Sequence, residues 1–247
     1  MDRLAENLHF QFVEYMLNKI WDNRWILRSL LQSVYFNFRH LPMRQAWKLP
    51  ILFYKPKKLK CTGKFEFNCP IKFGMIKLGV NLVSIYPDSG IKFENKGKII
   101  FNGKLTIGNN SAISVGKSGT LTFGDDVLAT CSLKLACYNS ITFEDNVLIG
   151  WDCLFIDTDF HKLTSTRPCP GKAYGPIHVG HNTWIATGCK LYKNATVPPE
   201  CVVGADTILH KPVGCAPKSL ISNEHKTIVH STPVYLDKTQ AEIIYSN

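Results

Sequence analysis

The sequence predicts an all-β solenoid, in which short strands joined by tight corners wind into stacked coils. A six-residue period runs through residues 179–214, and neither the 3.6-residue period of a helix nor the alternation of a long strand fits it. The first place of each six is aliphatic: Val179, Ile185, Leu191, Val197, Val203 and Leu209. The fifth place is small or apolar: Thr183, Cys189, Ala195, Cys201, Thr207 and Val213. An aliphatic residue at every sixth place fits short strands joined by tight corners, with three strands per coil.

Residues 1–60 are expected to form a basic α-helical region and a linker. Residues 2–38 lack Pro and Gly and place apolar residues at helical spacing, which predicts two short amphipathic helices with a break near residues 22–23. Pro42 and Pro50 then mark the linker. These 60 residues hold eleven Lys/Arg against four Asp/Glu, so much of the net charge of +10 lies here.

Two interpretations of this basic region stay open. Its mixture of aromatic and basic side chains suits the headgroup layer of an anionic membrane surface. Alternatively, the helices cap the open end of the solenoid or pack between subunits. No apolar run approaches the roughly 20 residues that cross a bilayer, and acids and polar groups stand where a secretory signal would have its apolar core. We therefore expect a cytoplasmic protein, either free or peripheral on the inner face of the membrane.

The solenoid is expected to span residues 61–215, followed by a tail at 216–247. A four-residue phrase of alternating apolar and polar residues recurs, and it starts at Leu105, Leu121, Ile141 and Ile177. Spacings of 16 and 20 between these phrases predict early coils that gain or lose residues at their corners. Phe143, Ile149 and Phe155 restore the strict period before the regular stretch.

The nine cysteines show no C-x-x-C pair, and several fall at inward places of the repeat. Cys153, Cys189 and Cys201 are therefore expected to be small buried thiols in a reducing compartment, with neither disulfides nor a zinc site.

The repeat resembles the hexapeptide-repeat acyltransferases, and within them the sugar and polysaccharide O-acetyltransferases of the galactoside and maltose acetyltransferase type. That resemblance implies a left-handed parallel β-helix, because the period alone does not set the handedness. It further implies acetyl-CoA as the acyl donor and a homotrimer with the coenzyme in the groove between neighbouring subunits.

The period fails between Phe155 and Val179, and residues 157–178 are expected to form a loop extruded from a corner, a place where function is common. The loop opens with Asp157, Thr158, Asp159, Phe160 and His161, a phrase similar to the catalytic entry of those acetyltransferases. Acetyl transfer to a hydroxyl needs a base for the hydroxyl proton, and a carboxylate near the other ring nitrogen would orient an imidazole. His161 is the predicted base, and either Asp157 or Asp159 is its predicted orienting partner.

The resemblance also implies a coenzyme site on two consecutive coils. The residues that match the family's phrases are Trp184, Ala186, Thr187, Gly204, Ala205 and Lys211. Ala186 and Asp206 replace glycines of the family pattern, and His210 replaces a threonine. The tail phrase at residues 231–235 is a weak match to the family's closing phrase.

The predicted function is acetyl-CoA-dependent O-acetylation of a sugar hydroxyl, free or lipid-linked, in the biosynthesis of capsule, exopolysaccharide or lipopolysaccharide. The alternatives are an acetyltransferase for a small soluble acceptor, such as an antibiotic or an amino sugar, and a non-catalytic binding solenoid. A zinc hydratase would need ligands from His161, His178 and His181, whose arrangement does not predict a metal site. No nucleic-acid-reading motif is present, so a nucleic-acid partner is not expected.

Overall fold

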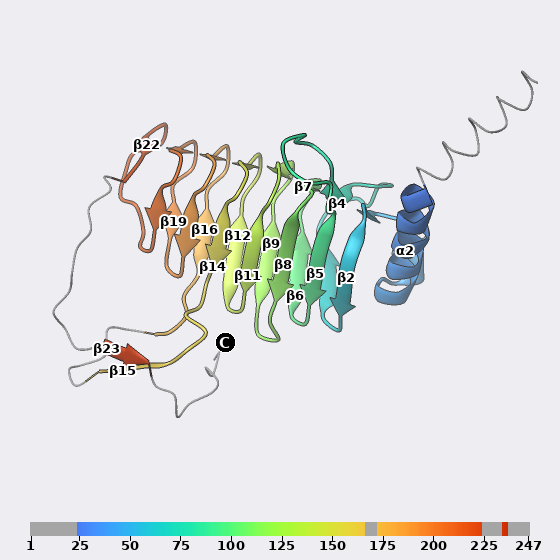
Figure 1. Cartoon of the computed structure of the whole chain (residues 1–247), viewed down its shortest axis with the longest axis horizontal. Helices are drawn as coiled ribbons and strands as arrows, with labels where there is room; N and C mark the ends of the chain where they lie inside the picture. The colour runs from blue at the N-terminus through green and yellow to red at the C-terminus, as the bar shows by residue number, and fades with distance from the viewer. Residues whose placement is uncertain (1–23, 166–171, 224–233, 237–247) are drawn as a thin grey trace, which may run out of the picture.

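The chain forms a three-sided prism of stacked coils with a helix across one end (Figure 1). The computed structural model describes residues 24–165, 172–223 and 234–236. Helix α2 (Arg24–His40) and the short α3 (Met43–Ala46) precede the first strand. Among the described residues, three sheets of eight, seven and six strands form the sides, and their neighbouring strands are parallel. The prediction of an all-β solenoid is confirmed.

Successive strands of the chain pass to successive sides of the prism. Sheet 1 contains β1 (Ile51–Phe53), β4 (Ile76–Val80), β7 (Leu105–Gly108), β10 (Val127–Ala129), β13 (Leu148–Ile149), β17 (Trp184–Ile185), β20 (Val202–Val203) and β22 (Leu220–Ile221). Sheet 2 contains β2 (Pro56–Cys61), β5 (Ile91–Asn95), β8 (Ser111–Val115), β11 (Lys134–Cys137), β14 (Leu154–Ile156), β18 (Lys190–Tyr192) and β21 (Ile208–Leu209). Sheet 3 contains β3 (Lys64–Phe67), β6 (Lys98–Phe101), β9 (Thr120–Phe123), β12 (Ser140–Phe143), β16 (Ile177–Val179) and β19 (Thr196–Val197). Outside the prism, β15 (Leu163–Ser165) pairs antiparallel with β23 (Val234–Leu236).

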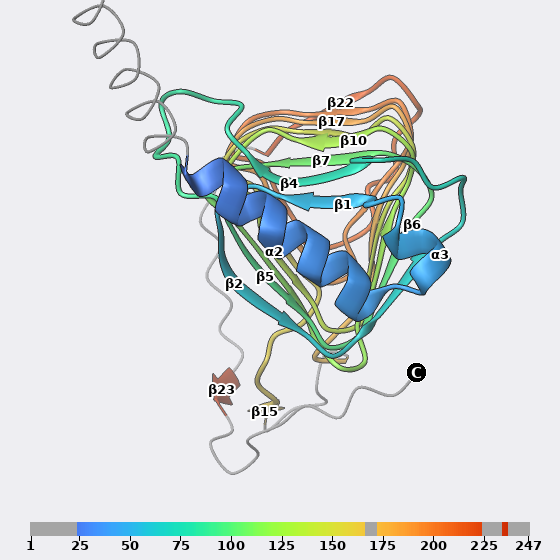
Figure 2. The ribbon, with the colours of Figure 1, turned by 90° about the vertical axis from the view of Figure 1, so that its right-hand side faces the viewer.

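The coils turn in the left-handed sense. Figure 2 looks down the prism from the end that carries α2. From there the chain runs along β1, descends β2 and rises on the side that contains β6, so it turns counter-clockwise while it recedes from the viewer. The handedness implied by the resemblance is therefore the observed one.

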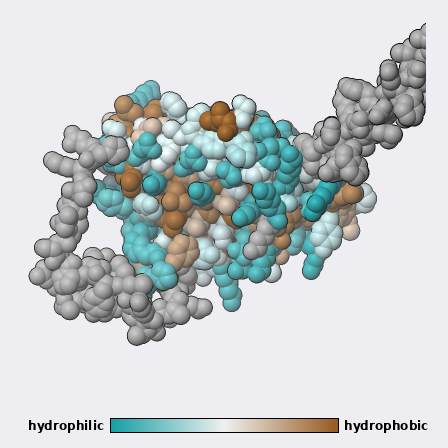
Figure 3. Space-filling model, viewed as in Figure 1, coloured by the Kyte–Doolittle hydropathy of each residue, from teal (hydrophilic) through white to brown (hydrophobic). Residues whose placement is uncertain are grey.

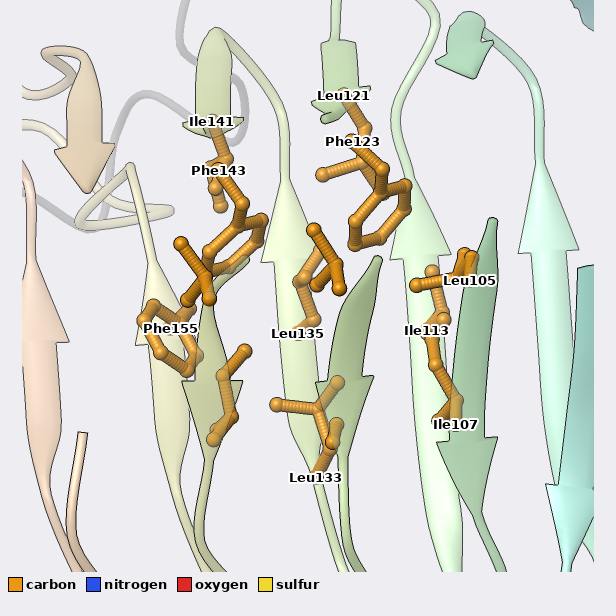
Figure 4. Close-up of a cluster of buried hydrophobic side chains, with 14 of the residues drawn as sticks. Leu105, Ile107, Ile113, Leu121, Phe123, Leu133, Leu135, Ile141, Phe143 and Phe155 are labelled. Atoms are coloured by element: carbon orange, nitrogen blue, oxygen red, sulfur yellow. The ribbon is translucent and has the colours of Figure 1, made fainter. Parts of the chain in front are cut away.

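The repeat positions fill the interior of the prism. The first-place residues from Val179 to Val203 are fully buried, and Leu209 is 6% exposed. Figure 4 shows the same inward packing in the earlier coils, where Phe123 and Phe143 stack with ring centroids 5.5 Å apart and Phe155 meets Phe143 edge-on. Burying an apolar side chain of this size contributes roughly 1.5–3 kcal/mol, so each coil adds its own increment of stability.

Three of the cysteines are buried, as the repeat predicts. Cys153, Cys189 and Cys201 are buried at the inner corners, and the eight cysteines in the described part of the chain are free thiols. Burial raises the pKa of Cys131 to about 11 and that of Cys61 to about 12, which makes these thiols poor nucleophiles.

The corners require left-handed backbone. At the corner between sheets 1 and 2, Asp152, Gly188 and Asp206 lie on three consecutive coils and adopt φ of +57°, +73° and +56°. Asp and Asn tolerate this conformation better than most residues, and Gly adopts it freely. At Gly188 a Cβ would lie 2.1 Å from a carboxylate oxygen of Asp206, so the space above this glycine is already filled.

Helix α2 closes the N-terminal end of the prism. Asn37 donates to the Ile51 carbonyl at 2.7 Å and accepts from its N–H at 3.2 Å, and Ser33 accepts from the Phe53 N–H at 2.8 Å. Phe36 packs edge-on against Phe53 at 4.8 Å between ring centroids. These bonds satisfy the free edge of β1, which would otherwise be open to pairing with another chain. Capping, one of the two interpretations of the basic region, is thus observed for α2.

Three expectations need correction. The coils begin at β1, inside the predicted linker of residues 1–60, and β22 extends them beyond residue 215. The phrase at Leu105 lies in sheet 1, whereas those at Leu121, Ile141 and Ile177 stack in sheet 3, so the 16-residue spacing is not a coil length. The linker also contains α3, which the proline pattern did not indicate. The predicted helix N-terminal to Arg24 lies outside the described residues, as does most of the tail.

Candidate active site

The predicted site residues lie along two different corners of the prism. The loop that carries His161 leaves the corner between sheets 2 and 3, directly after β14. Thr187 and Ala205 lie at the corner between sheets 1 and 2, one coil apart, because Ile185 pairs with Val203 in the parallel register. The width of sheet 2 separates the two groups within one chain.

The loop leaves the coil at residues 157–159 and returns at residues 173–175, and antiparallel backbone hydrogen bonds join these two segments, which we call the neck. Gly175 donates its N–H to the Asp157 carbonyl at 3.0 Å, and Asp159 donates its own to the Ala173 carbonyl at 2.7 Å. Thr158 and Tyr174 form an isolated bridge between the two chain segments. The loop therefore leaves and re-enters the coil through a fixed two-stranded neck.

Asp157 is fully buried and serves the backbone. Its two carboxylate oxygens accept the N–H groups of Tyr138 at 2.7 Å and Asn139 at 2.8 Å, both at the same corner one coil earlier. Burial raises the pKa of Asp157, while these N–H bonds oppose the rise. The carboxylate thus fastens the start of the loop to the preceding coil.

Asp159 is held by a cation from the following coil. Lys193 Nζ lies 2.5 Å from Asp159 Oδ2 and 2.9 Å from the Lys172 carbonyl oxygen, so one ammonium group bridges both strands of the neck. Lys193 was not singled out from the sequence. The one available signal was its place just after β18, where each earlier coil also turns from sheet 2 to sheet 3.

His161 is exposed at the end of the neck, two residues beyond Asp159. Phe160 adopts a left-handed φ of +60° and packs edge-on against Tyr138 at 5.0 Å between ring centroids. Within the described ranges, the His161 ring forms no hydrogen bond or ion pair with either Asp157 or Asp159. The structure therefore brings the three residues onto one neck but gives neither carboxylate an orienting contact with the imidazole.

The predicted coenzyme residues form a column at the corner between sheets 1 and 2. Thr187 accepts the Asp206 N–H at its carbonyl oxygen, 2.9 Å away, and donates its hydroxyl to the Trp151 carbonyl at 3.0 Å. Trp184 is 48% exposed on the outer face of sheet 1, and a Cβ at Gly204 would meet its nearest neighbour at 3.5 Å. The small side chains of this column leave its backbone open. The Asp206 carboxylate, which stands where the family pattern has a glycine, faces the column.

Lys211 lies apart from the other predicted coenzyme residues. It follows β21 at the corner between sheets 2 and 3, one coil beyond Lys193, because Leu191 pairs with Leu209. Both Lys211 and Ala205 are exposed, whereas Ala186 is buried. The column and Lys211 can therefore contact one ligand only if it crosses sheet 2 or lies between two copies of the chain.

The outer face of sheet 2 between these corners has a shallow hollow of about 280 Å³. Small and apolar side chains line much of it, including Ala112, Ala136, Leu154 and Ile156. Figure 3 shows brown side chains in the middle of this face, surrounded by teal ones.

The histidines of the zinc alternative do not converge. His178 Nε2 lies 3.0 Å from Glu144 Oε1, and His181 Nδ1 lies 3.1 Å from the Asn182 amide nitrogen. In the described part of the chain no group of three His, Cys, Asp or Glu side chains is arranged to hold a metal ion. His178 and His181 thus lie near the corner between sheets 3 and 1, away from the neck that carries His161.

Comparison with known proteins finds distant relatives. No family model matches the chain. It is 23% identical over 176 residues to an uncharacterized 24.8 kDa protein in the cps region of Klebsiella pneumoniae, covering 69% of this chain and 77% of that protein. It is 28% identical over 105 residues to a probable acetyltransferase of Mycobacterium tuberculosis, covering 42% of this chain and 35% of that protein's length. A hexapeptide-repeat acetyltransferase from Vibrio cholerae, solved with acetyl coenzyme A, aligns with a TM-score of 0.26 and 12% identity over 83% of this chain and 81% of that one.

Proposed function

We propose that this left-handed hexapeptide-repeat protein is an acetyl-CoA-dependent O-acetyltransferase that modifies a sugar hydroxyl of a surface polysaccharide in the cytoplasm. The observation that carries the proposal is the exposed His161 on a neck fixed by Asp157, Asp159 and Lys193. The mycobacterial relative supports the activity, and the cps-region relative from Klebsiella supports a polysaccharide acceptor.

In the proposed reaction, His161 takes the proton of the acceptor hydroxyl while the oxygen attacks the thioester carbonyl. The carbon–sulfur bond breaks, the proton passes from the imidazolium to the departing sulfur, and the products are a sugar acetate ester and coenzyme A. The fixed neck would hold the imidazole in place for this step, since proton transfer needs the base within hydrogen-bonding distance of the hydroxyl.

We further propose a homotrimer in which acetyl-CoA lies between subunits. The column with Trp184, Ala186, Thr187, Gly204 and Ala205 would contact the coenzyme on one subunit, and His161 and Lys211 would come from the facing corner of the next. The separation of the two corners by sheet 2 supports this arrangement. Lys211 would offer a cation to a coenzyme phosphate.

The first experiment follows the release of coenzyme A thiol from acetyl-CoA with a panel of sugar acceptors. His161→Ala should reduce the rate about 100- to 10,000-fold, the range expected for removing a general base. His178→Ala is the matched control, because this imidazole pairs with Glu144 on another face and should leave the rate unchanged. Unchanged turnover in His161→Ala would remove the proposed base.

A second experiment tests the shared site. Ala205→Trp should block the coenzyme column, so this variant and His161→Ala should each be inactive alone. Trimers re-formed from a mixture of the two contain some interfaces with an intact column facing an intact His161. Recovery of activity on mixing supports a site between subunits, and its absence indicates a site within one chain. Mass spectrometry of the products identifies the acceptor class, and transfer only to small amines or antibiotics would contradict the polysaccharide assignment.

A further inference from the structure

The outward face of the N-terminal cap is apolar. Leu31, Tyr35 and Phe38 follow one another at helical spacing on α2 and are 61%, 70% and 36% exposed. Met43 and Trp47, at 62% and 72%, extend this face beyond α2, and Phe38 meets Trp47 edge-on at 5.1 Å between ring centroids. We call these five residues the end plate. Contiguous exposed apolar side chains of this size usually mark an interaction surface.

The end plate is not the face with which α2 contacts the solenoid. That contact uses Ser33, Phe36 and Asn37, which are 1%, 2% and 0% exposed and bond or pack against β1. A helix that only caps a prism needs one apolar stripe and is polar on the other side. Helix α2 meets β1 through Phe36 and two buried polar side chains, and its outer face, which should be polar, is apolar instead, so this face calls for a second partner.

Positive charge predominates in the segment that carries the end plate. Residues 24–60 contain nine Lys/Arg and no Asp or Glu. The side chains of Arg28, Arg39, Arg44 and Lys48 are exposed on the same two helices and the turn after them. A partner for this surface must therefore offer apolar groups to the end plate and negative charge to the cations beside it.

A second copy of the chain meets that requirement poorly. In a two-fold contact the same patch faces itself, so the cations beside one end plate would meet those beside the other, and residues 24–60, which carry both, contain no acid to pair with them. The boundary layer of an anionic bilayer meets it well, because Tyr and Trp rings lie at the headgroup level and Arg and Lys reach lipid phosphates. Within the described residues, no helix is both long and apolar enough to cross a membrane.

We propose that the end plate binds the surface of an anionic lipid bilayer, with α2 parallel to the membrane and the prism standing on it. Figure 2 shows α2 lying across the end of the prism, so its outer side can meet a flat surface without obstruction from the coils behind it. This inference concerns where the protein binds and does not depend on the proposed acetyl transfer.

The test is co-sedimentation of the full chain with vesicles of phosphatidylcholine alone or with added phosphatidylglycerol. Binding is expected only with phosphatidylglycerol and should weaken as salt is raised. Arg39→Glu/Arg44→Glu should bind at least about 25-fold more weakly, since each cation near an anionic surface contributes roughly fivefold. Lys104→Glu/Lys117→Glu changes the net charge equally, away from the end plate, and should bind like the wild type.

A second set of variants tests the apolar contribution. Leu31→Ser/Tyr35→Ser/Trp47→Ser should abolish vesicle binding, whereas Leu220→Ser should not, although Leu220 is 72% exposed at the other end of the prism. The altered side chains are solvent-exposed, so the melting temperature should be nearly unchanged and would report any misfolding.

Three results would overturn the proposal: no binding to anionic vesicles, equal binding to neutral ones, or binding that survives in the triple variant. A smaller assembly in size-exclusion chromatography for the triple variant would instead make the end plate an interface between copies. Acetyl transfer to a soluble acceptor, measured on the same variants, should be unaffected. Failure of vesicle binding and failure of catalysis can therefore be told apart.

Discussion

Replacing Asp157 by asparagine separates two roles that this carboxylate could have. The wild-type side chain accepts two buried backbone N–H groups, from Tyr138 and Asn139. Asparagine keeps one acceptor oxygen and turns an NH₂ group toward the other N–H, which is left without a partner. Bonds to a charged acceptor contribute about 1.5–3 kcal/mol each, and an unpaired buried donor costs about 1–3 kcal/mol. Asparagine is neutral, so it also avoids the cost of burying a charge, which is the cost that raises the pKa of Asp157. This gain offsets part of the loss, and we expect the free energy of unfolding to fall by about 2 kcal/mol.

For a protein of this size, a loss of about 2 kcal/mol lowers the melting temperature by roughly 4–8 °C. Thermal unfolding followed by circular dichroism measures it. Asp159→Asn is the control, because Asp159 is in a partly exposed ion pair with Lys193 and should change stability by less than about 1 kcal/mol. If Asp157→Asn melts like the wild type but loses acetyl transfer, our structural assignment is wrong and Asp157 acts on the imidazole.

Three further predictions concern the neck, the core and the thiols. Lys193→Met should lower the rate of acetyl transfer severalfold in the thiol-release assay with little change in stability, because the neck loses its bridge to Asp159, whereas the exposed Lys190→Met should leave the rate unchanged. Phe143→Ala should lower the free energy of unfolding in guanidinium by about 3–5 kcal/mol, since it opens a cavity in the aromatic stack. Burial raises the pKa of Cys131 from 9.0 to about 11, so the stability contributed by the neutral thiol is complete below pH 9 and is lost as the pH rises through 11. The melting temperature should fall over this range, and less so in Cys131→Ala.

The regular half of the prism could be predicted from the sequence because each coil repeats the same geometric requirement. Ile185 and its partner one coil on, Val203, occupy the same place in successive coils, and both point into the interior of the prism. The six-residue period therefore predicts which residues are buried. The eighteen-residue separation of Thr187 and Ala205 likewise placed them in one column. The loop was found because it breaks the period.

The roles of Asp157 and Asp159 could not be read from their order. Both are carboxylates two residues apart, and the difference arises because Asp157 faces two N–H groups of the previous coil while Asp159 faces Lys193 of the next. These partners come from coils below and above the loop, and a linear pattern does not show which acid meets which coil. Similarly, the long early coils hid the start of the solenoid: Ile76 pairs with Leu105, so the period is interrupted there by residues outside the strands.

The position of the loop along the prism predicts the length of a membrane-linked acceptor. From β2 to β14 there are four strand spacings in sheet 2, about 19 Å at roughly 4.8 Å each. Helix α2 adds about 10 Å, so His161 would stand roughly 30 Å above a bilayer bound by the end plate. A single sugar on a lipid carrier would not reach it, whereas a chain of several sugars would. With vesicles that carry lipid-linked saccharides, acetylation should therefore rise steeply once the saccharide spans this distance, while the triple end-plate variant should show no such dependence. Equal rates on the shortest and longest lipid-linked acceptors would contradict the upright orientation.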